Sequence, residues 1–90
     1  MRLIYESQWE PPTKGYPYHR LNIGTWCAKV HPYTRENGSP AWLVTAGARH
    51  ERPRRFQNVM DDLSDAMIWA ERTLARIHAD NEAKRQEIGR

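Results

Sequence analysis

The sequence predicts an α+β domain in which an antiparallel β-meander of two to four strands packs on one long C-terminal helix. Two observations carry this prediction. Residues 58–77 repeat apolar side chains at helical spacing, which gives a single apolar stripe that another layer must cover. Residues 19–57 contain β-prone runs that flank an Asn-Gly turn signal. Because the chain has 90 residues, we expect one domain with one modest core.

The first 18 residues predict a short edge strand over residues 1–5, followed by an extended arm. Three prolines between residues 11 and 17 exclude both a helix and a central strand in that part. We expect the aromatic side chains of the arm, Trp9 among them, to pack it against the body, with a free recognition arm as the alternative.

Residues 20–31 predict the first long strand, and residues 41–47 predict a second strand that is apolar enough on both faces to lie centrally in the sheet. Alternation separates the first strand into two faces. One face carries Trp26, Ala28 and Val30, and the other carries Thr25, Cys27, Lys29 and His31. We expect a bulge at Gly24 that switches the faces. The Asn37-Gly38 pair predicts the tight turn of an antiparallel hairpin.

Residues 49–55 predict a basic loop, and residues 56–57 either begin a short third strand or fill the junction between sheet and helix. The helix is expected over residues 58–88, with Asn58 as its cap and Asp61 as the box partner. The stripe ends after residue 77, so the last turns should run into solvent. The predicted core consists of Trp26, Val44, Leu63, Met67 and Leu74.

The composition is that of an ordinary single-domain globular chain, and its basic charge is local. The formal charge is +3; residues 49–55 carry four basic groups and one acidic group, whereas residues 56–90 carry five and seven. A dedicated nucleic-acid binder of this size usually carries more positive charge. Cys27 is the only cysteine, so no internal disulfide can form. The sequence also has no signal-peptide or membrane-span pattern, and we expect a cytoplasmic protein.

The sequence favours neither an enzyme nor a protein that depends on a metal or cofactor. Cys27 and His31 share a strand face, but they lie roughly 13 Å apart along an extended chain, too far to bind one ion. The aspartates at 61, 62 and 65 are explained as capping residues that compensate the helix dipole. No nucleophile elbow and no Gly-rich phosphate loop is present in the sequence.

The strongest candidate for a binding surface is the arginine-rich loop, because arginine makes bidentate contacts with phosphates and carboxylates. The alternative is a solvated loop whose arginines pair with nearby acids. Ile68 lies opposite the helix stripe and suggests a partner or self-association. The candidate partner contacts are Arg49, Arg52, Arg54, Arg55, Trp9 and Ile68.

A second set of residues carries a resemblance. It comprises Trp26 and Ala28 in a Trp-x-Ala strand, Phe56 before the helix, and Ala66 and Trp69 on the helix. Their order resembles the N-terminal DNA-binding domain of phage-type tyrosine integrases, a three-stranded meander plus a helix. The resemblance implies major-groove contact through the sheet, with Lys29, His31 and Arg49 as candidate contacts. Residues 41–47 depart from the family pattern because they carry no cation.

In size and style, the whole chain resembles small phage or prophage accessory proteins of the anti-CRISPR and anti-defence kind. This resemblance implies stoichiometric binding to a host protein or protein–nucleic-acid complex, in the host cytoplasm. We therefore expect a small non-catalytic protein-binding domain, a monomer or a homodimer, that acts as a phage-type inhibitor. The alternative is a small DNA-binding module that uses the sheet face and residues 49–55. A third possibility is an assembly protein that dimerises through the helix.

Overall fold

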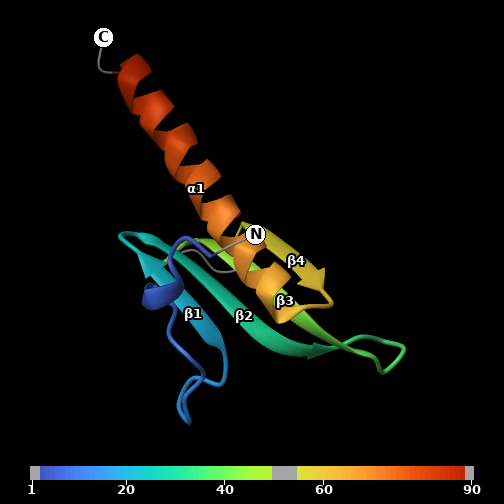
Figure 1. Cartoon of the computed structure of the whole chain (residues 1–90). Helices are drawn as coiled ribbons and strands as arrows, with labels where there is room; N and C mark the ends of the chain where they lie inside the picture. The colour runs from blue at the N-terminus through green and yellow to red at the C-terminus, as the bar shows by residue number, and fades with distance from the viewer. Residues whose placement is uncertain (1–2, 50–54, 89–90) are drawn as a thin grey trace.

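The computed structural model describes residues 3–49 and 55–88, with side chains described up to residue 80. The elements are η1 (Glu6–Gln8), β1 (His19–Ile23), β2 (Trp26–Thr34), β3 (Pro40–Ala48), β4 (Phe56–Met60) and α1 (Leu63–Ile88). The four strands form one antiparallel sheet in the order β1-β2-β3-β4, and α1 crosses one face of it (Figure 1). The predicted α+β fold is therefore confirmed.

The β2–β3 hairpin is the longest element pair, and it closes at the predicted Asn-Gly turn. Thr34 pairs with Pro40 at its end, and Arg35 N–H donates to the Ser39 carbonyl at 3.0 Å. Gly38 has a φ of +86°, a left-handed conformation that glycine adopts without a steric penalty. The Asn37 side chain accepts a hydrogen bond from Ser39 N–H at 3.0 Å, which fixes the turn.

The predicted first strand is in fact two strands joined by a second tight hairpin. Gly24 has a φ of +57°, and Ile23 pairs directly with Trp26 across the turn. The chain therefore reverses at Gly24, where a bulge was expected. The sequence could not distinguish the two because a bulge and a tight turn both exploit the left-handed conformation of glycine.

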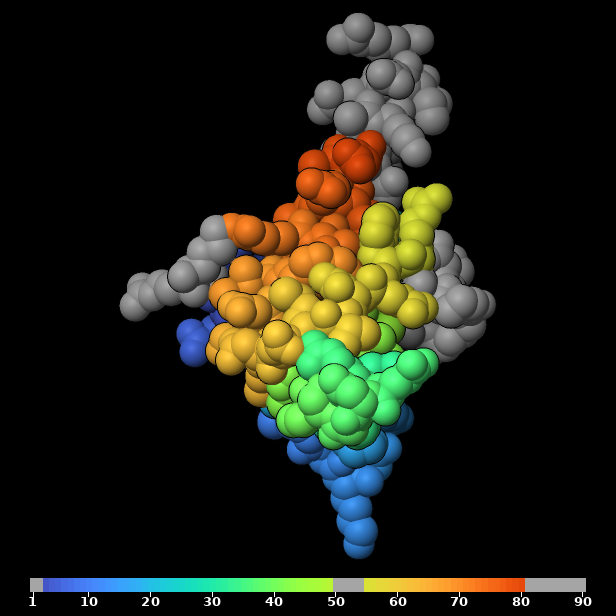
Figure 2. All heavy atoms as spheres, turned by 90° about the vertical axis from the view of Figure 1, so that its right-hand side faces the viewer, coloured from blue at the N-terminus to red at the C-terminus, as the bar shows by residue number. Residues whose placement is uncertain are grey.

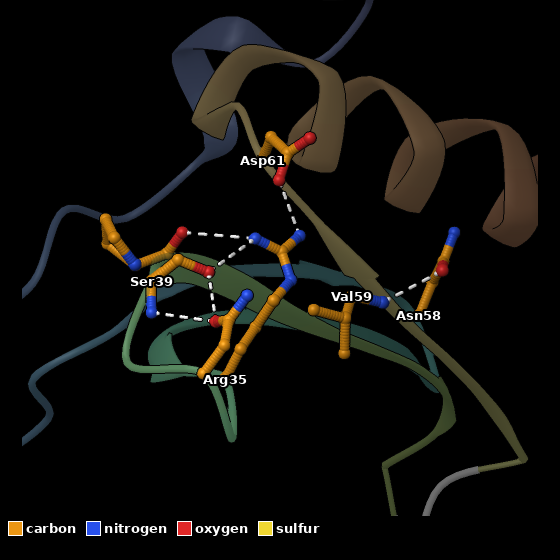
Figure 3. A network of polar contacts seen from close by, with 7 residues as sticks. Arg35, Ser39, Asn58, Val59 and Asp61 are labelled. Atoms are coloured by element: carbon orange, nitrogen blue, oxygen red, sulfur yellow. Dashed lines mark hydrogen bonds and ion pairs between the residues drawn. The ribbon is translucent and has the colours of Figure 1, made fainter.

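The predicted helix start is wrong by five residues. Asn58 lies in β4 and pairs with Val44, and α1 begins at Leu63. The capping residue is Asp62, whose carboxylate accepts a hydrogen bond from Asp65 N–H at 3.1 Å. The side-chain oxygen of Asn58 instead accepts from Val59 N–H at 2.9 Å, as Figure 3 shows. Residues 58–60 fit both a helical and a strand pattern, and they form a strand because they pair with β3.

A polar network ties the β2–β3 hairpin to the connection between β4 and α1 (Figure 3). The guanidinium of Arg35 forms an ion pair with Asp61 at 2.5 Å. The same guanidinium donates to the Ser39 hydroxyl at 3.5 Å and to the Pro40 carbonyl at 3.4 Å. Asp61 thus pairs with the β2–β3 hairpin, while Arg52 and Arg54 of the basic loop lie outside the described residues.

The N-terminal segment does not form the predicted edge strand in its described part. It contains the short helix η1 and is held by Glu71, a carboxylate of α1 that is only 2% exposed. Glu71 accepts hydrogen bonds from Ile4 N–H at 2.7 Å, Tyr5 N–H at 2.8 Å and the Trp9 indole N–H at 3.0 Å. A buried carboxylate with three donors is satisfied, which explains why a charged residue occupies the core.

After the segment that Glu71 holds, the chain runs across the edge of β1. Glu10 and Arg20 exchange two backbone hydrogen bonds, at 2.8 and 3.1 Å, and their side chains form an ion pair. The arm therefore starts beside α1 and covers part of the outer edge of β1, which leaves less of that edge open to pairing with another chain.

The core lies between the sheet and α1. The sheet contributes five fully buried side chains, Leu21, Ala28, Val30, Val44 and Ala46, and α1 contributes Ala66, Ala70, Leu74 and Ile77. The two helix alanines are small enough to let the helix approach the sheet closely. Among the predicted core residues, Val44 and Leu74 are buried, while Trp26, Leu63 and Met67 are half-buried and pack against the core. The last turns of α1 extend past the sheet (Figure 1).

Candidate functional site

The sheet face that points away from α1 is the main candidate surface, and we call it the open face. It consists of the strand residues that alternate with the core residues. They include Arg20, Asn22, Lys29, His31, Tyr33, Leu43, Thr45, Gln57 and Val59. Because successive side chains of a strand point to opposite faces, the burial of Leu21, Val30 and Val44 beneath α1 fixes this set on the other side.

The strand register arranges the open face in rows. Arg20 pairs with Lys29, Lys29 with Thr45, and Thr45 with Gln57, which gives one polar row across all four strands. The next row toward the β2–β3 turn pairs His31 with Leu43 and Leu43 with Val59; beyond it, Tyr33 pairs with Ala41. The open face is thus polar across its middle and apolar at one end.

Two tyrosines of the N-terminal arm lie against the cations of this face. The Arg20 guanidinium stands 4.3 Å from the centre of the Tyr16 ring, and the Lys29 ammonium stands 4.9 Å from the centre of the Tyr18 ring. Tyr18 also packs on the imidazole of His31, with 4.6 Å between ring centres. Each cation–π contact at such a partly exposed site contributes about 0.5–1 kcal/mol, so these rings hold the long side chains in place.

The charge of the open face is positive. Within the described strands it carries no acidic side chain, and the Glu10 carboxylate at its edge is paired with Arg20. Arg49 follows β3 directly, is exposed, and donates its backbone N–H to the Thr25 carbonyl at 2.9 Å. It continues the alternation of Thr45, which places it beyond the polar row on the same side.

A hollow of about 360 Å³ lies at the apolar end of the sheet, beside the β2–β3 turn. Its walls are formed by Pro32, Tyr33, Thr34, Pro40, Ala41, Trp42 and Asp61. The hollow exists because β4 ends at Met60, opposite Trp42, and leaves the last residues of β3 without a neighbouring strand. Its lining is mainly apolar and aromatic, with one carboxylate that is already paired with Arg35.

A second surface lies between α1 and β4. Figure 2 views the molecule from the side where these two elements lie next to each other. A groove here is lined by Met60, Ser64, Asp65, Ile68, Trp69 and Arg72. Ile68 and Trp69 are both half-buried, so each still shows apolar surface. Trp69 also lines an adjoining hollow with Phe56 and Arg76.

The predicted partner contacts are scattered over the molecule. Trp9 is 9% exposed and belongs to the core, so its burial disagrees with the predicted role as a surface anchor. Ile68 lies in the groove beside α1. Arg49 and Arg55 are exposed at the two ends of the basic segment, whereas Arg52 and Arg54 fall outside the described residues. Of the alternative set, Lys29, His31 and Arg49 lie on one side of the sheet.

Sequence reasoning missed several members of the open face. Arg20 was not recognised because residues 20–31 were interpreted as one strand, which hid the pairing of Arg20 with Lys29. Gln57 and Thr45 were missed because their position depends on the register of three strands. No local signal in residues 56–60 separates the two faces, because Gln57 and Asn58 are consecutive polar residues and Val59 and Met60 are consecutive apolar ones.

Burial lowers the pKa of His19 from its ordinary value, and its ring packs edge-on against Trp42 with 6.0 Å between centres. In residues 3–49 and 55–80, no group of three histidine, cysteine or acidic side chains is arranged to hold a metal ion. No helix in the described part is both long and apolar enough to cross a membrane.

No protein-family model matches this chain, and comparisons with curated proteins and with solved structures also give no match. The function is therefore argued from the geometry of the two surfaces.

Proposed function

We propose that this protein is a small non-catalytic domain that binds nucleic acid through the open face of its sheet. The observation that carries the proposal is the polar row from Arg20 to Gln57, which crosses all four strands on a face that α1 does not cover. Lysine and arginine bind phosphates, while threonine, glutamine and asparagine side chains offer hydrogen bonds to sugars and base edges.

Charge and preorganisation support the same function. The cations Lys29 and Arg49 lie on one side of the sheet with no acidic side chain among the described strand residues. Tyr16 and Tyr18 hold Arg20 and Lys29 against the sheet, so less side-chain entropy is lost on binding. The resemblance of residues 24–69 to integrase N-terminal domains favours this function too, because those domains contact DNA through the sheet.

The test is an anisotropy titration of a labelled oligonucleotide at about 50 mM and about 200 mM salt. We expect micromolar binding at the lower salt, with a log–log salt slope of about −2 to −3, because two or three phosphates would be neutralised. Lys29→Ala should weaken binding about three- to tenfold and reduce the slope by about one.

Arg76→Ala is the matched control. Arg76 is exposed on α1, away from the open face, and its removal changes the net charge by the same amount. We expect its affinity to equal that of the wild type. Equal losses in both variants would indicate a diffuse charge effect, and a wild-type protein that binds no oligonucleotide at low salt would refute the proposal.

A second candidate function is supported by the groove between α1 and β4. Half-buried Ile68 and Trp69 sit there beside Arg72, and aromatic, aliphatic and arginine side chains in a hollow are typical of protein-binding hot spots. This candidate is the phage-type inhibitor predicted from the sequence, which would bind a host protein in the cytoplasm.

A photo-crosslinking residue at position 68 would test this candidate in host cells. We expect one discrete protein adduct that disappears in a Trp69→Ala background. The control position is Glu36, which is exposed in the β2–β3 turn. The same adducts from both positions, or none from position 68, would argue against a partner in this groove.

A further inference from the structure

The open face is divided along the strands, and this division bears on the kind of nucleic acid that it fits. The polar row ends at β4 with Gln57, and the two rows between it and the β2–β3 turn are mostly apolar or aromatic. Tyr33 is 41% exposed and Val59 is 38% exposed, so this end presents real apolar surface. A ligand that covers the whole face must therefore offer anionic groups and flat apolar groups side by side.

A single strand offers both, and a duplex does not. In a duplex, the bases are stacked inside and the outer surface is formed by phosphate and sugar, so only groove edges reach a protein. In a single strand, each base face can leave the stack and pack on an aromatic ring while the phosphates follow a cationic groove. The placement of Lys29 in the polar row, with His31 and Tyr33 beyond it on the same face of β2, matches the second arrangement.

Tyr33 gives one base a place to stack. Its side chain alternates with the core residues of β2, is 41% exposed, and lies at the end of the open face where Leu43 and Val59 present apolar surface. The hollow beside the β2–β3 turn lies mainly on the other side of the sheet, because Pro32, Thr34, Pro40 and Trp42 fall on the α1 face by alternation. The phosphates are therefore expected over Lys29 in the polar row, and a base on the open side of Tyr33.

We infer that the open face binds single-stranded nucleic acid, with phosphates over Lys29 and Arg49 and one base stacked on Tyr33. This inference rests on the proposed function and adds the class of ligand to it. Tyr33 lies roughly 13 Å from Lys29 along β2, and Arg49 lies at the other end of the sheet, so a strand of several nucleotides is needed to contact all three.

The first arm of the test compares ligands. Fluorescence anisotropy at low salt would measure the Kd of the wild-type protein for a single-stranded DNA, an RNA of the same sequence, and the corresponding duplex DNA. We expect at least tenfold tighter binding of one or both single strands than of the duplex. The RNA-to-DNA ratio then tells which sugar the site accepts.

The second arm tests the base contact. Tyr33→Ala should weaken single-strand binding about tenfold, because stacking on an aromatic side chain contributes strongly to each bound base. Tyr33→Phe keeps the ring and should remain within about twofold of the wild type. Tyr33 is exposed, and the circular dichroism of both variants would establish that the fold is retained.

The outcomes distinguish a failure of this inference from a failure of the proposed function. Duplex binding as tight as single-strand binding would overturn this inference and leave the proposed function standing. Single-strand binding that is unchanged in Tyr33→Ala would overturn the placement of the base. Absence of binding to all three ligands would overturn the proposed function, and this inference with it.

Discussion

The two faces of the sheet are formed by the same four strands, but they differ in what covers them. The face toward α1 carries Leu21, Val30 and Val44, all with no exposed surface, and is sealed by a helix. The open face carries Lys29, His31 and Thr45, all half-buried, and Tyr18 of the arm lies against Lys29 and His31. The first face therefore holds the core of the domain, and the second is the face proposed for binding.

Alternation along each strand decides, residue by residue, whether a side chain packs in the core or lies on the candidate binding face. Leu21 and Arg20 are neighbours in the chain, yet one is in the core and the other is in the polar row. A substitution on one face should therefore change stability, and a substitution on the other face should change binding. Three measurements test this division between the core face and the open face.

The largest expected effect is on the core face. Leu21→Ala should lower the free energy of unfolding by about 2–5 kcal/mol, because it removes a fully buried side chain and leaves a cavity. Leu43→Ala, on the open face, should cost only about 1 kcal/mol because Leu43 is half-buried. Urea denaturation would measure both. Similar losses in the two variants would contradict the division of the sheet into a core face and a binding face.

The next effect concerns the two carboxylates that hold the arm. Glu71→Gln should lower the free energy of unfolding by about 1–3 kcal/mol, because an amide cannot accept all three hydrogen bonds and would leave a buried donor unsatisfied. Glu10→Gln, which weakens an exposed ion pair with Arg20, should change it by at most about 0.5–1 kcal/mol.

Thermal or urea denaturation would measure the stability of both carboxylate variants, and hydrogen exchange at the amides of Ile4 and Tyr5 would locate the change. Faster exchange there in Glu71→Gln but not in Glu10→Gln is the expected pattern. A Glu71→Gln protein as stable as the wild type would mean that the three hydrogen bonds of Glu71 contribute nothing to stability.

The smallest effect is on pH dependence. Burial lowers the pKa of His19 in the folded protein, so the unfolded chain binds more protons once the pH falls below about 6.5. The protein should therefore lose stability as the pH is lowered from 7 toward 5. In His19→Gln, this part of the pH dependence should be missing. Melting temperatures at several pH values, compared between the two proteins, would reveal a difference in slope; parallel curves would exclude a contribution of His19.

The sequence predicted the parts of the fold that depend on local patterns. The helical stripe that ends at Ile77, the Asn37-Gly38 turn and the central position of residues 41–47 all follow from spacing and turn chemistry within a few residues. The same reasoning placed Lys29 and His31 on one strand face, because alternation is a local property. The strand at Phe56 was one of two alternatives considered for residues 56–57.

The rest was decided by contacts between residues far apart in the chain. Residues 58–60 suit a helix or a strand, and only the pairing with β3 makes them a strand. Glu71 lies in the core because the backbone of residues 4–5 and the Trp9 indole, more than 60 residues away, satisfy its carboxylate. The polar row joins one residue from each of four strands. A sequence pattern records what a residue prefers locally, whereas register and burial are set by the packing of the whole chain, and the candidate site exists only at that level.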